Sequence, residues 1–399
     1  MKNCLLSGLT KWIIRGSSSC CLAILVACTP AKVQLNVVPL PNDMEIKTGF
    51  FEVDSAQFAN ESMDKFITCR IDSAFNRDLG EEGYNLSVSS GTIRLNACTE
   101  KGAFYGKQTL KQLLSSRGIP CVEIKDAPRF SYRGLHIDVS RHFFPKEEII
   151  KLLDEMAYYK LNKFHFHLTD NGGWRIQIDK YPRLTSMGAF RTQCEWVEWW
   201  DKKDRTYLPE GTPNAYGGYY TKEDIREILA HAEKLHIEVI PEIEFPAHSD
   251  EVFIGYPELC CTGKPYTSGE FCAGNERTYT FMENVLTEII DLFPSEYIHI
   301  GGDEARKIAW KTCSKCQTLM EKEGLKDLEE LQCYMIARME AFLTSKGKRM
   351  IGWDEVLNNH LAPTSTIISY RGQETASEAA NRGYNVVFTP GAALYFDWY

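Results

Sequence analysis

The sequence has too few basic residues to suggest a nucleic-acid-binding surface. Lys and Arg number 45 against 54 Asp and Glu, so the formal net charge is −9 at pH 7. Proteins that bind nucleic acid usually present a basic stripe to the phosphates, and nucleic acid is therefore not an expected partner. The 44% hydrophobic content is ordinary for a globular chain, and 399 residues leave room for two or more domains with their own cores.

A hydrophobic run long enough to cross a bilayer is missing from the N-terminal region. The run from Cys20 to Ala27 follows three basic residues and is too short for a transmembrane helix, so it resembles the core of a secretory signal. Residues 25–28 read Leu-Val-Ala-Cys, which resembles a bacterial lipobox with Cys28 as the lipidated residue. We therefore expect a lipoprotein signal peptide at 1–28 and a tether at 29–34. The remaining chain would be exported and anchored by lipid to a bacterial membrane, on its periplasmic or cell-surface side.

No second Cys-x-x-Cys pair accompanies Cys313-Ser-Lys-Cys316, although a zinc ribbon would need one. Cys260, Cys261 and Cys272 flank one loop, and export would permit disulfides. The spacing favours a bridge in that loop or free thiols over zinc. The sequence therefore predicts no metal and no cofactor.

The periodicity of hydrophobic residues changes between residues 35–127 and residues 128–399. The first stretch mixes short strand-like segments with one amphipathic helix at 102–114, which predicts a small α+β domain without visible chemistry. In the second, continuous apolar strands alternate with amphipathic helices, which predicts a parallel sheet buried on both faces. No glycine-rich nucleotide loop follows the first of these strands, so a TIM-type (β/α)8 barrel is favoured, with seven of its eight strands apparent. The seven strands are expected at 134–139, 163–168, 238–243, 297–300, 349–352, 366–369 and 385–388.

An acidic or aromatic side chain lies at or just after the end of every one of these seven strands. In a barrel such positions share the C-terminal face, where active sites are built. Surface solubility alone would also scatter acids elsewhere, so this pattern predicts a carboxylate-lined pocket with aromatic walls, which suits a sugar. These residues are Asp138, Arg141, Asp170, Glu242, Glu244, His248, Asp303, Glu304, Trp353, Asp354, Glu355, Tyr370, Arg371, Tyr395 and Asp397.

Asp303 and Glu304 follow a short apolar strand and two glycines, in the segment Tyr-Ile-His-Ile-Gly-Gly-Asp-Glu-Ala at 297–305. Gly and Asp are also common in plain turns. At a rigid strand end, however, two adjacent acids can be held in different environments and given different roles.

Four segments stand out, at residues 133–143, 164–175, 241–248 and 299–305, and Gly352-Trp-Asp354 and Tyr395-Phe-Asp397 are two shorter ones. Together they resemble glycoside hydrolase family 20, the β-N-acetylhexosaminidases. They occur in the family's order and spacing, and the resemblance covers the chain from about Val37 to its end, including a small N-terminal α+β domain.

The resemblance implies exo-acting hydrolysis of terminal non-reducing N-acetyl-D-hexosamine, either GlcNAc or GalNAc. Catalysis would be retaining and substrate-assisted, through an oxazolinium intermediate. Glu304 would protonate the leaving oxygen, Asp303 would hold the acetamido N–H, and Tyr395 would donate to the acetamido oxygen. The other implied roles are an orienting relay for the acid (Asp170, His248), hydroxyl binding (Arg141, Asp397) and the walls of the acetamido pocket (Trp353, Tyr370).

Two residues and the number of strands depart from the family pattern. Asn171 stands where a second acid is usual, and Tyr370 where Trp is common. The chain reaches Tyr399 after seven strands, whereas an eighth strand normally supplies a Trp beneath the sugar. An incomplete barrel with an exposed edge, low stability or weak activity is therefore expected.

Two other functions remain open from the residues. One is a lipid-anchored glycan-binding protein that does not turn its ligand over. The other is a metal-dependent barrel hydrolase that uses His165, His167 and His248 as ligands. The sequence leaves the glycosidic linkage and the oligomeric state open.

Overall fold

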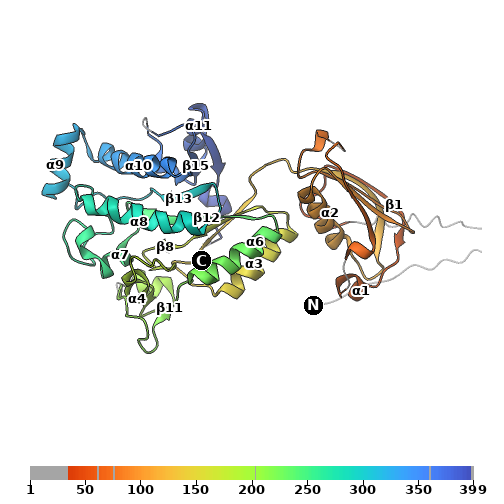
Figure 1. Ribbon diagram of the computed structural model, residues 1–399, viewed down its shortest axis with the longest axis horizontal. Coiled ribbons are helices and arrows are strands. Elements are labelled where there is room, and N and C mark those ends of the chain that lie inside the picture. The colour runs from red at the N-terminus through yellow and green to blue at the C-terminus, as the bar shows by residue number, and fades with distance from the viewer. Residues whose placement is uncertain (1–34, 61–62, 75–76, 203, 359–360, 397–399) are drawn as a thin grey trace, which may run out of the picture. The chain divides into compact units, whose positions relative to one another are not determined.

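The computed structural model describes residues 35–60, 63–74, 77–202, 204–358 and 361–396 (Figure 1). The predicted signal peptide, its lipidation site Cys28 and the tether at 29–34 lie outside the described residues, as does Asp397. Among the described helices, none has the length and apolarity that a membrane crossing requires.

A five-stranded sheet forms the small N-terminal domain, in the order β1-β5-β3-β4-β2 (Figure 1). All neighbouring strands are antiparallel except the β2–β4 pair. Helix α2 packs on this sheet with Ala103, Tyr105 and Leu110 buried, and the side chain of Thr99 caps its first turn. The prediction of a small α+β domain is confirmed. The strands are β1 Asp43–Phe51, β2 Ile67–Ile71, β3 Tyr84–Val88, β4 Ile93–Ala97 and β5 Ile119–Asp126, and the helices are α1 Ser55–Asn60, η1 Met63–Lys65, η2 Arg77–Leu79 and α2 Glu100–Leu113.

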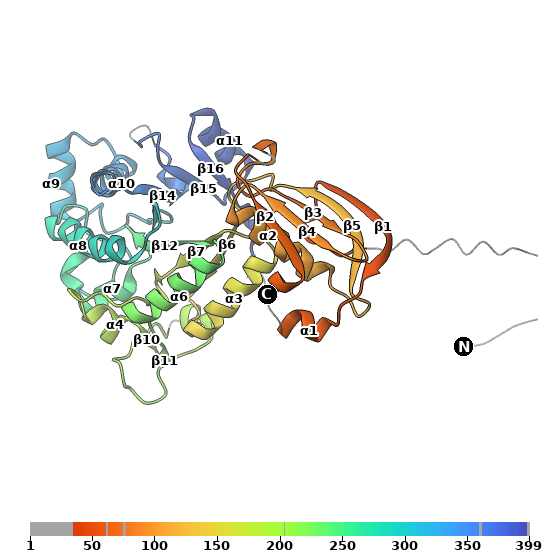
Figure 2. The same cartoon turned by 45° about the vertical axis from the view of Figure 1, so that its right-hand side comes forward.

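A curled parallel sheet of seven strands forms the second domain in the described part of the chain (Figure 2). Its order is β16-β15-β14-β13-β12-β7-β6, and every neighbouring pair is parallel. The strand predictions and the barrel-type fold are confirmed. The strands are β6 Gly134–Asp138, β7 Lys163–His167, β12 Glu238–Phe245, β13 Tyr297–Gly301, β14 Arg349–Trp353, β15 Thr366–Ser369 and β16 Asn385–Phe388.

Burial falls from the centre of this sheet to its two outer strands. Strands β12, β13 and β15 are almost wholly buried, whereas β6 and β16 are largely half-buried or exposed. Within the described residues β6 and β16 do not pair with each other, so the sheet is an open half-barrel. Exposed strand edges of this kind can pair with other chains.

Amphipathic helices lie side by side along the sheet, with α3 against α6, α6 against α8 and α8 against α10 (Figures 1 and 2). Thr221 and Asp224 cap the first turn of α6, because they exchange side-chain and backbone hydrogen bonds. The helices are α3 Lys146–Tyr158, α6 Lys222–Lys234, α8 Glu276–Leu292, α10 Leu328–Ser345 and α11 Gln373–Asn381. Shorter elements in the connections are β8 Thr169–Asp170, β9 Gly173–Trp174, α4 Arg183–Gly188, β10 Phe190–Arg191, α5 Trp196–Trp200, β11 Tyr216–Gly217, α7 Asp250–Gly255, η3 Pro257–Leu259, α9 Ser314–Glu323, η4 Asp354–Val356 and α12 Gly391–Leu394.

Strand β7 shows how the sequence directs polar groups into the barrel. Successive side chains of a strand point to opposite faces. Phe164 and Phe166 belong to the hydrophobic core that the helices complete. His165 and His167, which alternate with them, lie beside the carboxylate of Glu242 instead. The alternation therefore separates an apolar outer layer from a polar interior that leads to the strand ends.

Candidate active site

Asp303 and Glu304 leave the end of β13 in unequal environments. The Asp303 side chain is 14% exposed and that of Glu304 is 61% exposed. Glu304 has a φ of 49°, a left-handed conformation that a residue with a side chain seldom adopts. The backbone therefore turns one acid inward and leaves the other open to a ligand from solvent.

Two glycines make this turn sterically possible. Gly301 and Gly302 have φ values of 67° and 97°. A Cβ on Gly301 would lie 1.8 Å from Oε2 of Glu244, and one on Gly302 would lie 2.1 Å from Cγ1 of Val356. Both positions therefore need glycine for its conformation and for the space that it leaves.

His248 connects a buried carboxylate to the two acids. Its Nδ1 lies 3.1 Å from Oδ1 of Asp170, and its Nε2 lies 3.5 Å from both Oδ2 of Asp303 and Oε2 of Glu304. His248 also has a left-handed backbone, with a φ of 52°. The four residues that the sequence predicts as acids and relay are thus brought together.

Arg141 holds the other side of Asp170. Its Nη1 lies 2.6 Å from Oδ2 of Asp170 and 2.8 Å from Oδ2 of Asp138. Burial disfavours the guanidinium charge, but the two carboxylates outweigh burial and raise the pKa of Arg141. Asp170 therefore divides its two oxygens between two cationic partners, Arg141 and His248.

These contacts set the protonation of the relay. Burial opposes the charge on His248, but the Asp170 carboxylate and hydrogen bonds to Asp303 and Glu304 raise its pKa well above the usual range. The hydrogen bond from His248 in turn lowers the pKa of Glu304. At neutral pH the ligand-free site thus contains a protonated His248 beside an ionised Glu304.

Three aromatic side chains stand beside the acids at the ends of β14 and β15 and after β16. The Trp353 and Tyr370 rings meet edge to face with centroids 5.6 Å apart, and the Tyr370 and Tyr395 rings stack at 6.5 Å. Glu355 joins this wall to the acid, since it accepts from the Tyr370 hydroxyl at 2.7 Å and from the Glu304 backbone N–H at 3.0 Å. The sequence pattern placed Glu355 after its strand but assigned it no role.

Glu242 lies beneath the wall and is fully buried. It accepts from the Trp353 indole at 2.9 Å, and Nε2 of His165 and Nδ1 of His299 lie 2.8 and 2.9 Å from its oxygens. Burial opposes ionisation, but the surrounding histidines lower the pKa of Glu242 well below its usual range. Trp353 is 7% exposed. A small part of its ring is therefore accessible, while its N–H donates to the buried Glu242. The sequence places Glu242 on its strand but does not reveal that its carboxylate holds the Trp353 indole.

Asn171, the departure next to the relay, contacts His248 directly. Its side-chain nitrogen lies 3.3 Å from Nδ1 of His248, and its oxygen accepts from the backbone N–H of Asp250 at 3.1 Å. Asn171 therefore borders the relay without adding a charge to it.

The three histidines on which the metal-hydrolase alternative depends do not come together in the structure. His165, His167 and His248 do not form one group of potential ligands in the described part of the chain. His165 lies beside Glu242, whereas His248 lies beside Asp170. Burial lowers the pKa of His165 to about 3, so its imidazole is neutral at neutral pH.

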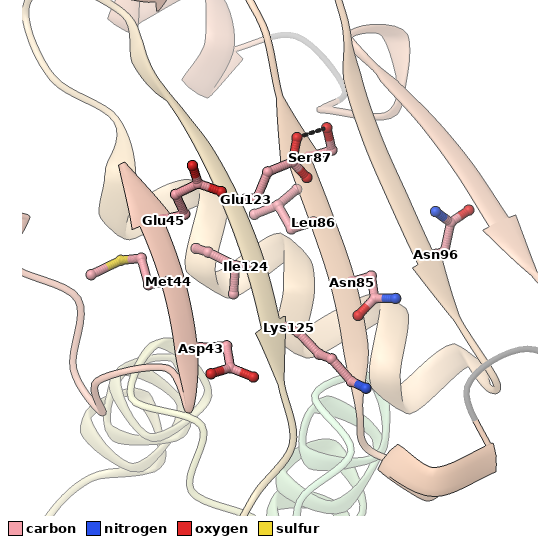
Figure 3. A pocket seen from close by; sticks show the side chains of 10 residues that line it. All are labelled: Asp43, Met44, Glu45, Asn85, Leu86, Ser87, Asn96, Glu123, Ile124 and Lys125. Atoms are coloured by element: carbon pink, nitrogen blue, oxygen red, sulfur yellow. Dashed lines mark hydrogen bonds between the residues drawn. The ribbon is translucent and has the colours of Figure 1, made fainter. Parts of the chain in front are cut away.

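A shallow hollow of about 570 Å³ lies on the small domain rather than at the strand ends. Figure 3 shows its lining side chains projecting from β1, β5, β3 and β4, with Ser87 bonded to Glu123. It contains no cluster resembling the one around Glu304, so the candidate site is the one at the barrel strand ends.

A parallel barrel-type sheet with paired carboxylates and an aromatic wall at its C-terminal edge defines a barrel glycoside hydrolase. The chain belongs to glycosyl hydrolase family 20, as predicted. The model of this family's catalytic domain matches residues 130–399, and that of its domain 2 matches residues 56–127.

Bacterial relatives support this assignment. The chain is 37% identical to a beta-hexosaminidase of Porphyromonas gingivalis over 98% of this chain and 55% of that one. It is 40% identical to a beta-hexosaminidase of Vibrio furnissii over 81% of this chain and 54% of that one. The fold matches a Vibrio harveyi exo beta-N-acetylglucosaminidase crystallised with N-acetylglucosamine, with a TM-score of 0.78, 32% identity, and coverage of 89% of this chain and 60% of that one. The chain thus spans about half the length of the first two of these relatives.

Replacing Gly301 should destabilise the protein far more than a matched glycine substitution. Gly324 has a φ of 69°, close to the 67° of Gly301, but nothing lies within 4 Å of the position that a Cβ would take there. Gly324→Ala should lose about 1 kcal/mol from the backbone conformation alone. Gly301→Ala should lose a further ~1–3 kcal/mol because its methyl collides with Glu244. Urea unfolding measures both, and equal losses would contradict the steric argument.

Stability should depend on pH through His248. A raised folded pKa stabilises the fold fully below the unfolded value of about 6.5, and this contribution is lost as pH rises through the folded pKa. Wild type should therefore lose more free energy of unfolding than His248→Gln between about pH 6 and about pH 9. Parallel stability curves for the two proteins would show that His248 is not held in its charged form.

Proposed function

We propose that this chain provides the catalytic machinery of an exo-acting β-N-acetylhexosaminidase, which hydrolyses terminal non-reducing N-acetyl-D-hexosamine with retention. The names of the relatives and the N-acetylglucosamine in the Vibrio harveyi crystal support this substrate class. In this proposal the nucleophile is the substrate's own 2-acetamido carbonyl, which forms an oxazolinium intermediate.

The buried oxygen of Asp303 carries the proposal. Within the described residues, Oδ1 of Asp303 has no hydrogen-bond partner. A buried acceptor without a donor is costly, and a ligand N–H would satisfy it. The adjacent Glu304 is exposed. An acetamido N–H at Asp303 would thus place the glycosidic oxygen within reach of a second, solvent-facing acid.

Proton transfer follows from the pair His248 and Glu304. Substrate would displace water from Glu304, which disfavours its ionised form and allows it to take a proton. The protonated imidazole, 3.5 Å from Oε2 of Glu304, is a proton source. Glu304 then protonates the leaving oxygen and, as a base, activates the water that opens the intermediate.

The aromatic wall would complete the acetamido pocket. Trp353 and Tyr370 offer apolar surface for the acetamido methyl, and the Tyr395 hydroxyl would donate to the acetamido oxygen. Arg141 and Asp397 would bind ring hydroxyls, with Arg141 already fixed by Asp138 and Asp170. GlcNAc and GalNAc are both compatible with this arrangement.

Glu304→Gln should reduce kcat for a β-N-acetylglucosaminide by about 10²–10⁴-fold, because the variant cannot donate a proton to the leaving group. Affinity for N-acetylglucosamine, measured by calorimetry, should change little. The loss should be smaller for a 4-nitrophenyl leaving group, which needs less protonation, than for a disaccharide.

A matched control is Glu329→Gln, which alters an exposed acid paired with Lys307 and should leave kcat unchanged. The glycan-binding alternative also predicts unchanged affinity in Glu304→Gln, but it predicts no turnover by wild type and hence no loss of turnover in the variant. Equal cleavage of a matched β-glucoside, which lacks the acetamide, would contradict the substrate-assisted mechanism.

The proposal includes a location outside the cytoplasm, supported by the lipobox-like residues 25–28. Wild type expressed in a bacterium should incorporate labelled palmitate and partition into detergent, whereas Cys28→Ala should do neither. Absence of label from wild type would contradict lipid anchoring.

A further inference from the structure

Four cysteine thiols from two separate loops converge near the start of α9. Cys261 and Cys272 belong to the connection between β12 and α8, and Cys313 and Cys316 stand at the beginning of α9. The four Sγ atoms all lie within 4.8 Å of one another. We call these four residues the cysteine cluster.

The spacing of the sulfur atoms matches a metal tetrahedron. The Sγ of Cys316 lies 3.7 Å from that of Cys261 and 3.8 Å from that of Cys272. The Sγ atoms of Cys272 and Cys313 are also 3.7 Å apart. Tetrahedral zinc with Zn–S bonds of about 2.3 Å separates its sulfurs by about 3.8 Å. Bridged sulfurs lie only about 2.05 Å apart, and Cys261, Cys272, Cys313 and Cys316 are all unbridged.

The surrounding backbone is shaped around the cysteine cluster. Cys272 and Cys316 are buried, whereas Cys261 and Cys313 are half-buried. A Cβ on Gly274 would lie 2.1 Å from the carbonyl of Lys315, so glycine is needed for this close approach.

The fold supplies a second cysteine pair, although the sequence has no second Cys-x-x-Cys spacing. Cys261 and Cys272 are not a Cys-x-x-Cys pair, and the expectation of no metal depended on that spacing. Their loop nevertheless folds back on itself. An antiparallel β-bridge between the backbones of Cys260 and Phe271 brings the two thiols together. Cys260 itself is directed elsewhere, with its thiol donating to the carbonyl oxygen of Pro257.

We propose that Cys261, Cys272, Cys313 and Cys316 bind one Zn²⁺ in a closed tetrathiolate site. Four protein ligands leave no open position for substrate or water, so the role is structural. The metal would fasten the loop after β12 to the segment after β13, which also carries Glu304.

Contacts already present join the same two segments. Oε1 of Glu270 accepts the backbone N–H groups of Arg306 and Lys307 at 2.9 and 3.2 Å. The indole of Trp310 donates to the carbonyl of Phe271 at 2.8 Å. Zinc would therefore reinforce an interface that fixes the chain two residues after the proposed acid.

Metal analysis of the full chain tests the site. Protein expressed with zinc sulfate and dialysed should contain one zinc per chain by mass spectrometry. X-ray absorption should show four sulfur neighbours at about 2.3 Å. Cys272→Ser and Cys316→Ser should lose at least about nine-tenths of the metal, because one ligand fewer greatly weakens a structural site. Cys260→Ser and Cys333→Ser, outside the cysteine cluster, should retain it.

A measurement on wild type guards against variants that fail to fold. Titration with a mercurial reagent should release zinc, detected by an indicator dye, in step with modification of the cysteine cluster. Loss of zinc should also lower Tm by several degrees. A wild-type chain that takes up no zinc from excess zinc sulfate would overturn the proposal. So would an intact mass and peptide map showing two disulfides among these four cysteines.

Discussion

The buried carboxylate of Asp170 is the charge on which the rest of the site depends. It is 1% exposed, and a carboxylate in such surroundings is stable only when it is paired. Arg141 and His248 pair with its two oxygens from opposite sides, and each is therefore fixed in position. Removing one partner from a buried pair costs about 3–5 kcal/mol, since it leaves the other charges uncompensated. The same pairing directs the imidazole of His248 at Asp303 and Glu304, so the charge network that stabilises the interior also sets the proton chemistry of the surface.

The backbone contributes as much to this arrangement as the charges do. His248 and Glu304 both adopt left-handed conformations, at φ values of 52° and 49°. Such conformations persist only when surrounding contacts hold them. For Glu304 these contacts include the carboxylate of Glu355, which accepts its N–H. The two glycines before it leave the room that Glu244 and Val356 occupy. The exposed acid is therefore supported by its neighbours although its own side chain has freedom to meet a ligand.

The sequence predicted the barrel strands and the acids that follow them because both depend on local patterns. Apolar runs identify buried parallel strands, and parallel strands bring their C-terminal ends to one edge. Strand β2 carries no apolar pattern that would reveal it in the sequence, because only Ile67 among its residues is buried. The role of Glu242 was missed for a different reason, since its partners His165, His299 and Trp353 come from three other strands. Contacts between distant segments leave no periodic signal in the sequence.

The cysteine cluster is a second case in which contacts between distant segments are not visible in the sequence. It also bears on function, because it lies close to the segment that carries Glu304. The chemistry of Cys313 and Cys316 depends on two cysteines that precede α8, and only the folded chain brings the two pairs within bonding range. Catalysis requires groups held to within about 0.5 Å by rigid supports, and Glu304 begins a long connection rather than ending a strand. Glu270 binds that connection at Arg306 and Lys307, and Trp310 within the connection donates to Phe271. The cysteine cluster closes the connection a few residues further on. A structural metal there would extend the rigidity of β13 beyond its last residue, where the proposed proton donor needs it.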